Sequence, residues 1–465
     1  MKIEQIYTSC IAEAAYYIES DGEAAIIDPL REFEPYINKA DEDGAKIKYI
    51  FETHFHADFV SGHIDLARKT GAQIVYGPTA KAGFDIIEAK DNQEFSIGKI
   101  KIKVLHTPGH TMESVTYMLI DELGIEHAIF TGDTLFLGDV GRPDLAVKSD
   151  LTEVQLAEYL FDSLRTKIMP LSDDTIVYPG HGAGSSCGKN LSDETVDTLG
   201  HQKRTNYALR PDMTKAEFVS EVLDGMLPPP QYFPKNAMMN KMGYEPIDEV
   251  MHRGNLPLSV EEFEAKMKEG ALVLDVRSED EYRESHIPGS LYIGLDGNFA
   301  MWVGALIEDL KRQIVVVCPE ERHFETVMRL ARVGYDEGHG FLNGGMKAWQ
   351  DSGRAVNSVD SVSVFELSKL MKQEPINIVD VRKIGEYEAE RIEDAIHYPL
   401  DFINSHLDDL EKDSKYYIHC KAGYRSMTAI SILQNAGYKN LVDVKGGMDA
   451  ILESDIPVLA VECQG

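Results

Sequence analysis

The sequence predicts an α/β fold divided into several domains, and three observations lead to this prediction. The chain has 465 residues, which at about 150 residues per domain corresponds to about three domains. Its first half alternates short β-branched runs with helical patterns, and several runs end in polar residues, as strands do where they meet functional loops. Its second half contains two similar stretches of domain size.

The strand-like runs of the first half are short and apolar, and they occupy residues 24–28, 46–52, 72–77, 101–107 and 127–133. A helix is expected from about Thr214, because Thr214 and Glu217 form the T-x-x-E pattern of a capping box. The three prolines 228–230 and the polar stretch that follows to about Gly254 predict a linker or an arm that wraps around the domain.

The composition is that of a soluble globular protein with a strong acidic excess. Lys and Arg number 46 against 78 Asp and Glu, a formal net charge of -32. Such a charge disfavours nucleic acid and anionic membranes as partners, and an anionic substrate would need local cations, a metal or backbone N–H groups. The sequence has no apolar run of about 18 residues and no secretion signal at its start. Five widely spaced cysteines fit a reducing cytosol, so we expect a cytoplasmic protein.

The second half is an internal repeat of about 105 residues. Both copies begin with S-x-x-E before a helical pattern, continue into an apolar strand that ends in D-V-R, and close with G-G-M before another helix. This period is too long for a solenoid unit. The repeat therefore predicts two copies of one small α/β domain, with matching positions Ser259, Glu262 and Asp275 in the first copy and Ser363, Glu366 and Asp380 in the second.

Histidine and aspartate residues in the first half have the character of metal ligands. Each follows an apolar strand-like run or lies in a glycine-containing turn after one, so all of them could converge on one edge of a sheet. A divalent cation needs imidazole and carboxylate ligands held by rigid elements. The candidates are His54, His56, Asp58, His110, Asp133 and His181.

This pattern resembles the metallo-β-lactamase superfamily, and within it the persulfide dioxygenases that are fused to rhodanese domains. The resemblance implies an αββα sandwich for the first domain. Phe59 stands where the family's H-x-H-x-D-H motif has its last histidine, which removes a ligand of the second metal site and leaves the first. In the dioxygenase branch one iron(II) per chain is held by two histidines and one aspartate, here His54, His110 and Asp133, leaving open positions for substrate and O₂. Two roles are open for His56, Asp58 and His181. They could support the three ligands, or they could remain from a second site at which a weak metal could still bind.

Two further stretches, 138–145 and 178–189, resemble the substrate loops of that branch. Arg142 and Lys189 could present positive charge to an anionic persulfide, or they could be ordinary surface cations. Cys10 could face the metal and carry sulfur, or it could be a small buried thiol. Cys187 is expected to be a packed loop residue rather than a nucleophile.

The motif H-C-K-A-G-Y-R-S at 419–426 predicts a second reactive site. Cys420 lies between an apolar strand and a helix, where converging N–H groups and the helix dipole favour the nucleophilic thiolate, and Arg425 adds a fixed cation. The C-x4-R spacing resembles rhodanese sulfurtransferases, which are doubly wound α/β domains, whereas phosphatases of related fold use C-x5-R. The resemblance implies that Cys420 and Arg425 are catalytic. It also implies that the loop around the persulfide contains Lys421, Ala422, Gly423, Tyr424 and Ser426.

The first copy of the repeat departs from this motif, and we expect it to be inactive. Pro319 follows Cys318 directly and removes one N–H donor from the loop. Glu320 and Glu321 add negative charge, which opposes a thiolate. The predicted domains are thus a metallo-β-lactamase-fold domain at 1–245, an inactive rhodanese-like domain at 250–355 and a rhodanese sulfurtransferase at 360–465.

The implied activity is oxidation of a small thiol persulfide by O₂ to sulfite at iron(II), with zinc as the alternative metal. Cys420 would then make thiosulfate from sulfite or use thiosulfate to supply persulfide, in sulfide detoxification or sulfur metabolism. The thiol carrier is left open among glutathione, coenzyme A, bacillithiol and free sulfide. The expected partners are small molecules, and a homodimer or homotetramer would be ordinary for such an enzyme.

Two other classes of function remain open. The first is a glyoxalase-II-like thioester hydrolase with two zinc ions and an accessory sulfurtransferase domain, which requires a complete second metal site. The second is a non-catalytic sulfur carrier with a structural metal, which requires that Cys420 take up sulfur without any consumption of O₂.

Overall fold

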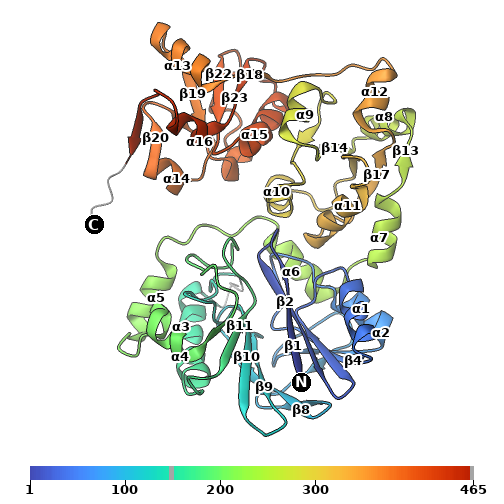
Figure 1. The fold of residues 1–465 in the computed structure, drawn as a ribbon, viewed down its shortest axis with the longest axis vertical. Helices are drawn as coiled ribbons and strands as arrows, with labels where there is room; N and C mark the ends of the chain where they lie inside the picture. Colours follow the sequence, from blue (N-terminus) through green and yellow to red (C-terminus); the bar gives the residue numbers. More distant parts are fainter. Residues whose placement is uncertain (146–150, 461–465) are drawn as a thin grey trace. The chain divides into compact units, whose positions relative to one another are not determined.

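The computed structural model describes residues 1–145 and 151–460, which form two compact units. The first unit contains residues 1–248 and the short segment 331–334, and the second contains the remainder of the chain. Each unit combines sheets and helices (Figure 1), as the predicted α/β class requires.

The first unit contains two six-stranded sheets. The first sheet follows chain order, with β1 Lys2–Thr8, β2 Glu13–Ser20, β3 Glu23–Ile27, β4 Lys46–Phe51, β5 Gln73–Tyr76 and β6 Ile87–Glu88. The second has the order β12-β11-β10-β9-β8-β7, with β7 Glu94–Ile97, β8 Ile100–His106, β9 Val115–Ile120, β10 Glu126–Gly132, β11 Ile176–Pro179 and β12 Asp197–Thr198. The parallel pairs β3–β4 and β10–β11 bring the ends of neighbouring strands to the same edge.

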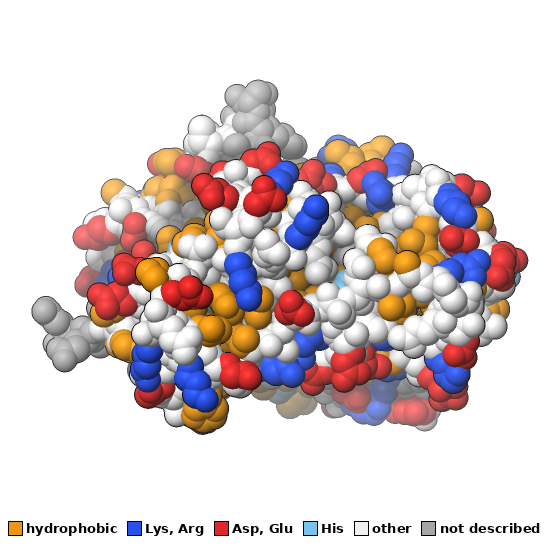
Figure 2. All heavy atoms as spheres, turned by 90° about the horizontal axis from the view of Figure 1, so that it is seen from above, with side chains coloured by type: hydrophobic (Ala, Val, Ile, Leu, Met, Phe, Trp, Pro, Cys, Tyr) orange, Lys and Arg blue, Asp and Glu red, His pale blue; other side chains and the backbone are white. Residues whose placement is uncertain are grey.

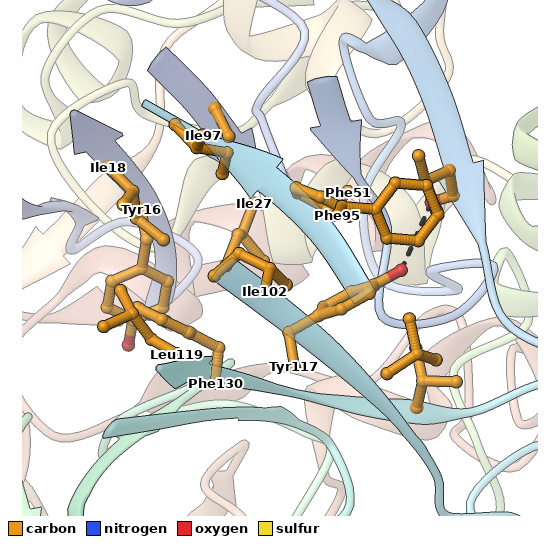
Figure 3. Close-up of a cluster of buried hydrophobic side chains, with 14 of the residues drawn as sticks. Tyr16, Ile18, Ile27, Phe51, Phe95, Ile97, Ile102, Tyr117, Leu119 and Phe130 are labelled. Atoms are coloured by element: carbon orange, nitrogen blue, oxygen red, sulfur yellow. Dashed lines mark hydrogen bonds between the residues drawn. The ribbon is translucent and has the colours of Figure 1, made fainter. Parts of the chain in front are cut away.

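The two sheets face each other across one apolar core, shown in Figure 3. Ile18 and Phe51 come from the first sheet, and Leu119 and Phe130 come from the second. Phe51 and Tyr117 pack with ring centroids 4.9 Å apart. Burial of this apolar surface, at about 25 cal/mol per Å², is the main force that joins the sheets.

Helices cover the outer faces of both sheets (Figure 1). α1 (Glu34–Glu42) and α2 (His63–Thr70) contact β4. α3 (Glu153–Ser163) continues as a π-helical turn, Leu164–Ile168, and packs with α5 (Lys215–Leu223) on the second sheet through Leu160 and Phe218. α4 (Leu199–Thr205) and the 3-10 turn Tyr207–Leu209 complete this layer. The αββα sandwich implied by the sequence is therefore confirmed.

The local predictions for residues 214–254 have mixed outcomes. Thr214 and Glu217 form the predicted capping box at the start of α5. The stretch after the prolines is not an irregular linker, however, because it contains α6 (Phe233–Met242) and α7 (Ile247–Gly254). Proline at the start of α6 is compatible with a helix because the first-turn N–H groups have no intrahelical partner. The alternative of an arm that packs on the domain fits α6, since its Asn240 is fully buried.

The second unit contains two parallel five-stranded sheets of equivalent order, β13-β17-β16-β14-β15 and β18-β23-β22-β19-β21. The first has β13 Pro257–Leu258, β14 Leu272–Asp275, β15 Leu291–Tyr292, β16 Ile314–Val317 and β17 Gly338–Leu342, with α8 Val260–Lys268, α9 Glu279–Glu284, α10 Phe299–Leu306, α11 His323–Arg332 and α12 Gly345–Asp351. The second has β18 Asp360–Val362, β19 Asn377–Asp380, β21 Ile396–His397, β22 Tyr416–His419 and β23 Leu441–Val444, with α13 Val364–Gln373, α14 Ile384–Ala389, the 3-10 turn Leu400–Ser405, α15 Tyr424–Asn435 and α16 Gly447–Leu452. β20 (Glu390–Ile392) and β24 (Val458–Ala460) form a separate ribbon.

The equivalent strand orders confirm the internal repeat. Ser259 with Glu262 and Ser363 with Glu366 form the two expected capping boxes, at the starts of α8 and α13. None of the helices in the described part of the chain has the length and apolar character that crossing a membrane requires.

Candidate metal centre and sulfur-transfer site

The predicted metal ligands lie where strands of the first unit end. His54 follows β4, His110 follows β8, and Asp133 follows β10 directly. One ligand atom from each of these three buried residues lies within 4.8 Å of the others. The Nε2 atom of His110 lies 3.5 Å from Oδ2 of Asp133. Residues separated by 79 positions in the sequence thus form one compact group.

Hydrogen bonds to Nδ1 fix the two imidazole rings, so that the other ring nitrogen of each remains free to bind a metal ion. Nδ1 of His54 lies 3.0 Å from Oγ1 of Thr53, which in turn donates to Asp28. Nδ1 of His110 lies 2.8 Å from the carbonyl oxygen of Arg142. Burial, together with neighbouring imidazoles, holds the pKa of His54 well below its ordinary value, which favours the neutral form that binds metals.

The carboxylate of Asp133 is the clearest sign of a bound cation. It is buried, and neither of its oxygens has a hydrogen-bond partner among the residues that the structure describes. A buried ionised oxygen without a partner is costly. Two imidazoles and one carboxylate in this arrangement fit a divalent cation with open coordination positions.

Two glycines allow the backbone to approach Asp133. A Cβ atom on Gly180 would lie 2.9 Å from Oδ1 of Asp133, and one on Gly141 would lie 2.0 Å from its carbonyl oxygen. The glycines of the P-G-H-G and D-V-G-R segments are therefore required by close packing around this ligand.

His56 contacts a different set of residues. Its Nε2 lies 3.0 Å from Oδ1 of Asp28 and 3.6 Å from Oε2 of Glu52, both buried. Although burial opposes protonation, the charge and hydrogen bond of Asp28 raise the pKa of His56 to about 9. His56 is thus directed toward Asp28 and Glu52, and its ring also lies 4.2 Å from that of His54 and 4.4 Å from that of Phe59.

Asp58 and His181 lie together on the other side of Asp133. Nε2 of His181 lies 3.3 Å from Oδ2 of Asp58 and 3.5 Å from Oδ1 of Asp133. Cys187 is the third member of this buried group. Burial, together with the charges of Asp58 and Asp133, raises the pKa of the Cys187 thiol well above its ordinary value.

The cations expected to bind substrate are engaged with acceptors of their own chain. Arg142 is buried and forms a 2.7 Å ion pair with Asp144, and Lys189 donates to the carbonyl oxygens of Glu221 and Asp224. Cys10 is half-buried, and its Sγ lies 3.3 Å from Nη1 of Arg332, in the segment 331–334 of the same unit. Elsewhere acidic and basic side chains are interspersed over the face shown in Figure 2. The substrate roles of these three residues stay predictions.

The second reactive site lies between β22 and α15, where the sequence places it. Cys420 is buried, and its Sγ accepts a 3.1 Å hydrogen bond from the backbone N–H of Gly423. Gly423 has a φ of +125°, a conformation that glycine adopts far more readily than other residues. Lys421 and Ala422 of the same loop are exposed. Arg425 forms hydrogen bonds of 2.6 and 2.8 Å with the carboxylate of Glu386.

Three matches to known families agree with this geometry. Residues 10–181 match the metallo-beta-lactamase superfamily, and residues 259–352 and 363–454 match the rhodanese-like domain. The hydroxyacylglutathione hydrolase GloC of Haemophilus influenzae is 31% identical over 232 residues, which are 44% of this chain and 97% of that protein. The chain belongs to the metallo-β-lactamase superfamily.

Other relatives support the same assignment. A metallo-beta-lactamase structure from Staphylococcus aureus subsp. aureus COL is 31% identical with a TM-score of 0.63, over 74% of this chain and 98% of that one. A hydroxyacylglutathione hydrolase of Brucella anthropi is 41% identical over 142 residues, 30% of this chain and 48% of that protein. The predicted architecture, a metallo-β-lactamase fold followed by two rhodanese-like domains, is confirmed.

In the second rhodanese-like domain, the G-G-M motif contacts the backbone of the reactive loop. The N–H groups of Met448 and Asp449 donate to the carbonyl oxygens of Cys420 and Lys421. A Cβ atom on Gly447 would lie 2.5 Å from the carbonyl oxygen of Cys420. The start of α16 thus anchors the backbone of the reactive loop.

Gly447→Ala is therefore expected to displace this loop and slow alkylation of Cys420 at least tenfold, as measured by iodoacetamide labelling followed by mass spectrometry. Gly437→Ala is the matched control, because Gly437 also has positive φ, +96°, but its Cβ would meet no described atom within 4 Å. Equal labelling rates in the two variants would show that the contact with Cys420 does not matter.

The first rhodanese-like domain provides a poor environment for a thiolate. Burial, together with the charge of Asp275, raises the pKa of Cys318 to about 12. At pH 8 only about one in 10⁴ of such thiols is ionised. We expect Cys318 to be labelled by iodoacetamide at a rate that rises about tenfold per pH unit between pH 8 and 11. A pH-independent rate above pH 9 would contradict this assignment.

The reactive loop of the second rhodanese-like domain also contacts the first one. The hydroxyl of Tyr424 donates a 2.6 Å hydrogen bond to the carbonyl oxygen of Gly294. Ser426 donates to Oδ1 of Asp443 at 2.8 Å, and Oδ2 of Asp443 accepts from Arg283 at 2.9 Å. Arg283 belongs to α9 of the first domain, so a residue of one copy supports the loop of the other.

The sequence analysis did not single out Glu386, Asp28 or Asn240, although the sequence contains a pattern that points to the first two. Glu386 follows D-V-R in the second copy as Glu281 does in the first, so aligning the repeats could have singled it out. Asp28 ends an apolar strand, as Asp133 does. Asn240 left none: it donates from α6 to the carbonyl oxygens of His56 and Phe59 and so fixes the loop of the histidine motif.

Proposed function

We propose that the metallo-β-lactamase-fold unit is a mononuclear iron(II) persulfide dioxygenase, and that the second rhodanese-like domain transfers sulfur through Cys420. The observation that carries this proposal is the buried group of His54, His110 and Asp133 beside Phe59, the residue that replaces a second-site histidine. When bound to these three residues, iron(II) would supply the redox chemistry that joins O₂ to the persulfide sulfur.

The protein's own residues would orient and isolate the reacting groups. Thr53 and Asp28 hold the ring of His54, and the carbonyl oxygen of Arg142 holds that of His110. One ligand atom of each ring lies within 4.8 Å of the other and of Asp133. The ligands are at most 2% exposed, which limits access of bulk water. Overall, a persulfide, O₂ and water would yield the thiol, sulfite and two protons, with four electrons passing from the sulfane sulfur to O₂.

At the second site, Cys420 would carry the sulfur as a persulfide. The thiolate of Cys420 is the leaving group when sulfite attacks the outer sulfur, which yields thiosulfate; the reverse reaction loads the cysteine. The Gly423 N–H, 3.1 Å from Sγ, would stabilise negative charge on sulfur in either direction.

The test is O₂ uptake by the iron(II)-loaded full-length protein with glutathione persulfide or coenzyme A persulfide, with sulfite and thiosulfate quantified. The proposal expects O₂ uptake in the wild type, and a change of product from thiosulfate to sulfite in Cys420→Ser. Absence of O₂ uptake with any persulfide would refute the dioxygenase and favour thioester hydrolysis with zinc.

The names of the relatives favour a second candidate, hydrolysis of a hydroxyacylglutathione thioester with two metal ions. The same preparation, loaded with zinc, would then hydrolyse such a thioester and consume no O₂ with persulfides. Phe59 argues against this candidate in its usual form, because phenylalanine cannot ligate a metal. This comparison of substrates separates the two chemistries directly.

A further inference from the structure

Glu279 of the first rhodanese-like domain lies against the reactive loop of the second. Apart from neighbours in the chain, a Cβ atom on Gly423 would find only Glu279 among the described residues within 4 Å, with Oε1 at 3.9 Å and Cγ at 4.0 Å. The N–H of Gly423 is the group that donates to Sγ of Cys420. The carboxylate of Glu279 therefore lies beside the residue that supports negative charge on this sulfur.

The helix α9 fixes Glu279 at this place. Glu279 is its first residue, and Arg283 follows one turn later on the same face. Arg283 is bound to the buried Asp443 of the second domain at 2.9 Å, so α9 is tied to the domain that contains the loop. Burial raises the pKa of the Tyr424 hydroxyl, and the negative charge of Glu279 raises it further, so the field of this carboxylate reaches the loop.

The charge of Glu279 is not balanced by the cation of the reactive loop motif. Arg425 is already engaged by the carboxylate of Glu386, at 2.6 and 2.8 Å. Glu279 is partly exposed, Lys421 is exposed, and neither has an ion-pair partner among the residues that the structure describes. An anion near Cys420 therefore experiences a negative charge that Arg425 does not offset.

We propose that Glu279 determines which sulfur compounds react at Cys420, by disfavouring dianions such as thiosulfate relative to singly charged and neutral reagents. Coulomb repulsion is proportional to charge, so a dianion is repelled twice as strongly as a monoanion. When thiosulfate loads the cysteine, the Cys420 thiolate attacks the outer sulfur, the S–S bond of thiosulfate breaks, and sulfite leaves with the bonding electron pair. This specificity rests on the proposed sulfur transfer, whereas the field of Glu279 acts on any anion at Cys420.

The field is measured by alkylation of Cys420 in the full-length protein with iodoacetate, an anion, and with neutral iodoacetamide. Both reagents need the thiolate, so the ratio of their rate constants, followed by mass spectrometry, does not depend on the pKa of the thiol. Glu279→Gln should raise the ratio of the iodoacetate rate to the iodoacetamide rate about threefold at low ionic strength, and Glu279→Lys about tenfold. Glu284→Gln is the matched control and should leave the ratio unchanged, because it removes the same charge from an exposed position at the other end of α9.

Sulfur transfer is then measured as formation of the Cys420 persulfide, by mass spectrometry. Glu279→Gln should be loaded about tenfold faster than the wild type by thiosulfate, and about threefold faster by the singly charged 2-hydroxyethyl persulfide. An unchanged alkylation ratio in Glu279→Gln, or equal gains with the two sulfur donors, would overturn the inference. A shifted ratio in a protein that takes up no sulfur from either donor would refute the proposed sulfur transfer, and with it the specificity, while confirming the field of Glu279.

Discussion

His110→Ala is expected to abolish persulfide-dependent O₂ uptake and to remove the cation bound at the triad. The side chain is 1% exposed and is one of the three proposed ligands. Loss of a group that merely supports a ligand usually lowers metal affinity about 10–100-fold, so loss of the ligand itself should cost more. Metal content by elemental analysis and O₂ uptake with an oxygen electrode measure the two effects.

His106→Ala provides the matched control for this variant. His106 ends β8, four residues before His110, and its Nε2 contacts the carbonyl oxygen of Met112 rather than the triad. This variant should keep its iron and its activity. If His110→Ala retained stoichiometric iron and O₂ uptake, the assignment of the metal ligands would be wrong.

Much of the fold could be predicted from the sequence because the patterns involved are local. Strand-like runs followed by His54 and His110, and one that ends in Asp133, indicate that these side chains meet, and the structure places their ligand atoms within 4.8 Å. The repeated D-V-R and S-x-x-E motifs likewise predict two equivalent parallel sheets. In the repeats, strand ends meet because neighbouring parallel strands share an edge. The triad is assembled differently, from the end of β4 in one sheet and the ends of β8 and β10, which flank β9, in the other.

The contacts between distant segments could not be predicted in the same way. Asn240 lies in a stretch whose composition indicates a linker, yet it is buried against the histidine motif because α6 folds back on the domain. Cys187 has the sequence context of an ordinary glycine-rich loop, and only the folded backbone brings it beside Asp58 and His181. A single sequence indicates which helices and strands are locally favoured, but it does not indicate which distant segments contact each other in the folded chain.

Arg283→Leu is expected to destabilise the second unit by about 3 kcal/mol and to slow sulfur transfer by Cys420. Asp443 is fully buried, and Arg283 is its only described cationic partner. Removal of one partner from a buried ion pair typically costs about 3–5 kcal/mol. Burial raises the pKa of Asp443 and Arg283 opposes that rise, so the variant should move the pKa of Asp443 further upward.

The link from Arg283 to sulfur chemistry passes through two hydrogen bonds. Asp443 accepts from Ser426 at 2.8 Å, and Oγ of Ser426 lies 3.7 Å from Sγ of Cys420. A protonated Asp443 would accept less strongly from Ser426, and the reactive loop would lose part of its fixed geometry. Urea unfolding measures the stability change, and the pH profile of Cys420 alkylation measures the effect on the loop.

Arg354→Leu is the matched control, because Arg354 pairs with the partly exposed Glu261 and Glu264 at 3.3 and 3.2 Å within the same unit. Such exposed pairs contribute about 0–1 kcal/mol, so this variant should unfold nearly as the wild type does and keep its alkylation profile. Arg283→Lys should recover part of the stability, since it keeps the charge but loses the two-atom contact with Asp443. An alkylation profile of Arg283→Leu identical to that of the wild type would mean that the first rhodanese-like domain does not tune Cys420. A shifted profile together with partial rescue by lysine would show that the first rhodanese-like domain tunes the reactive loop of the second.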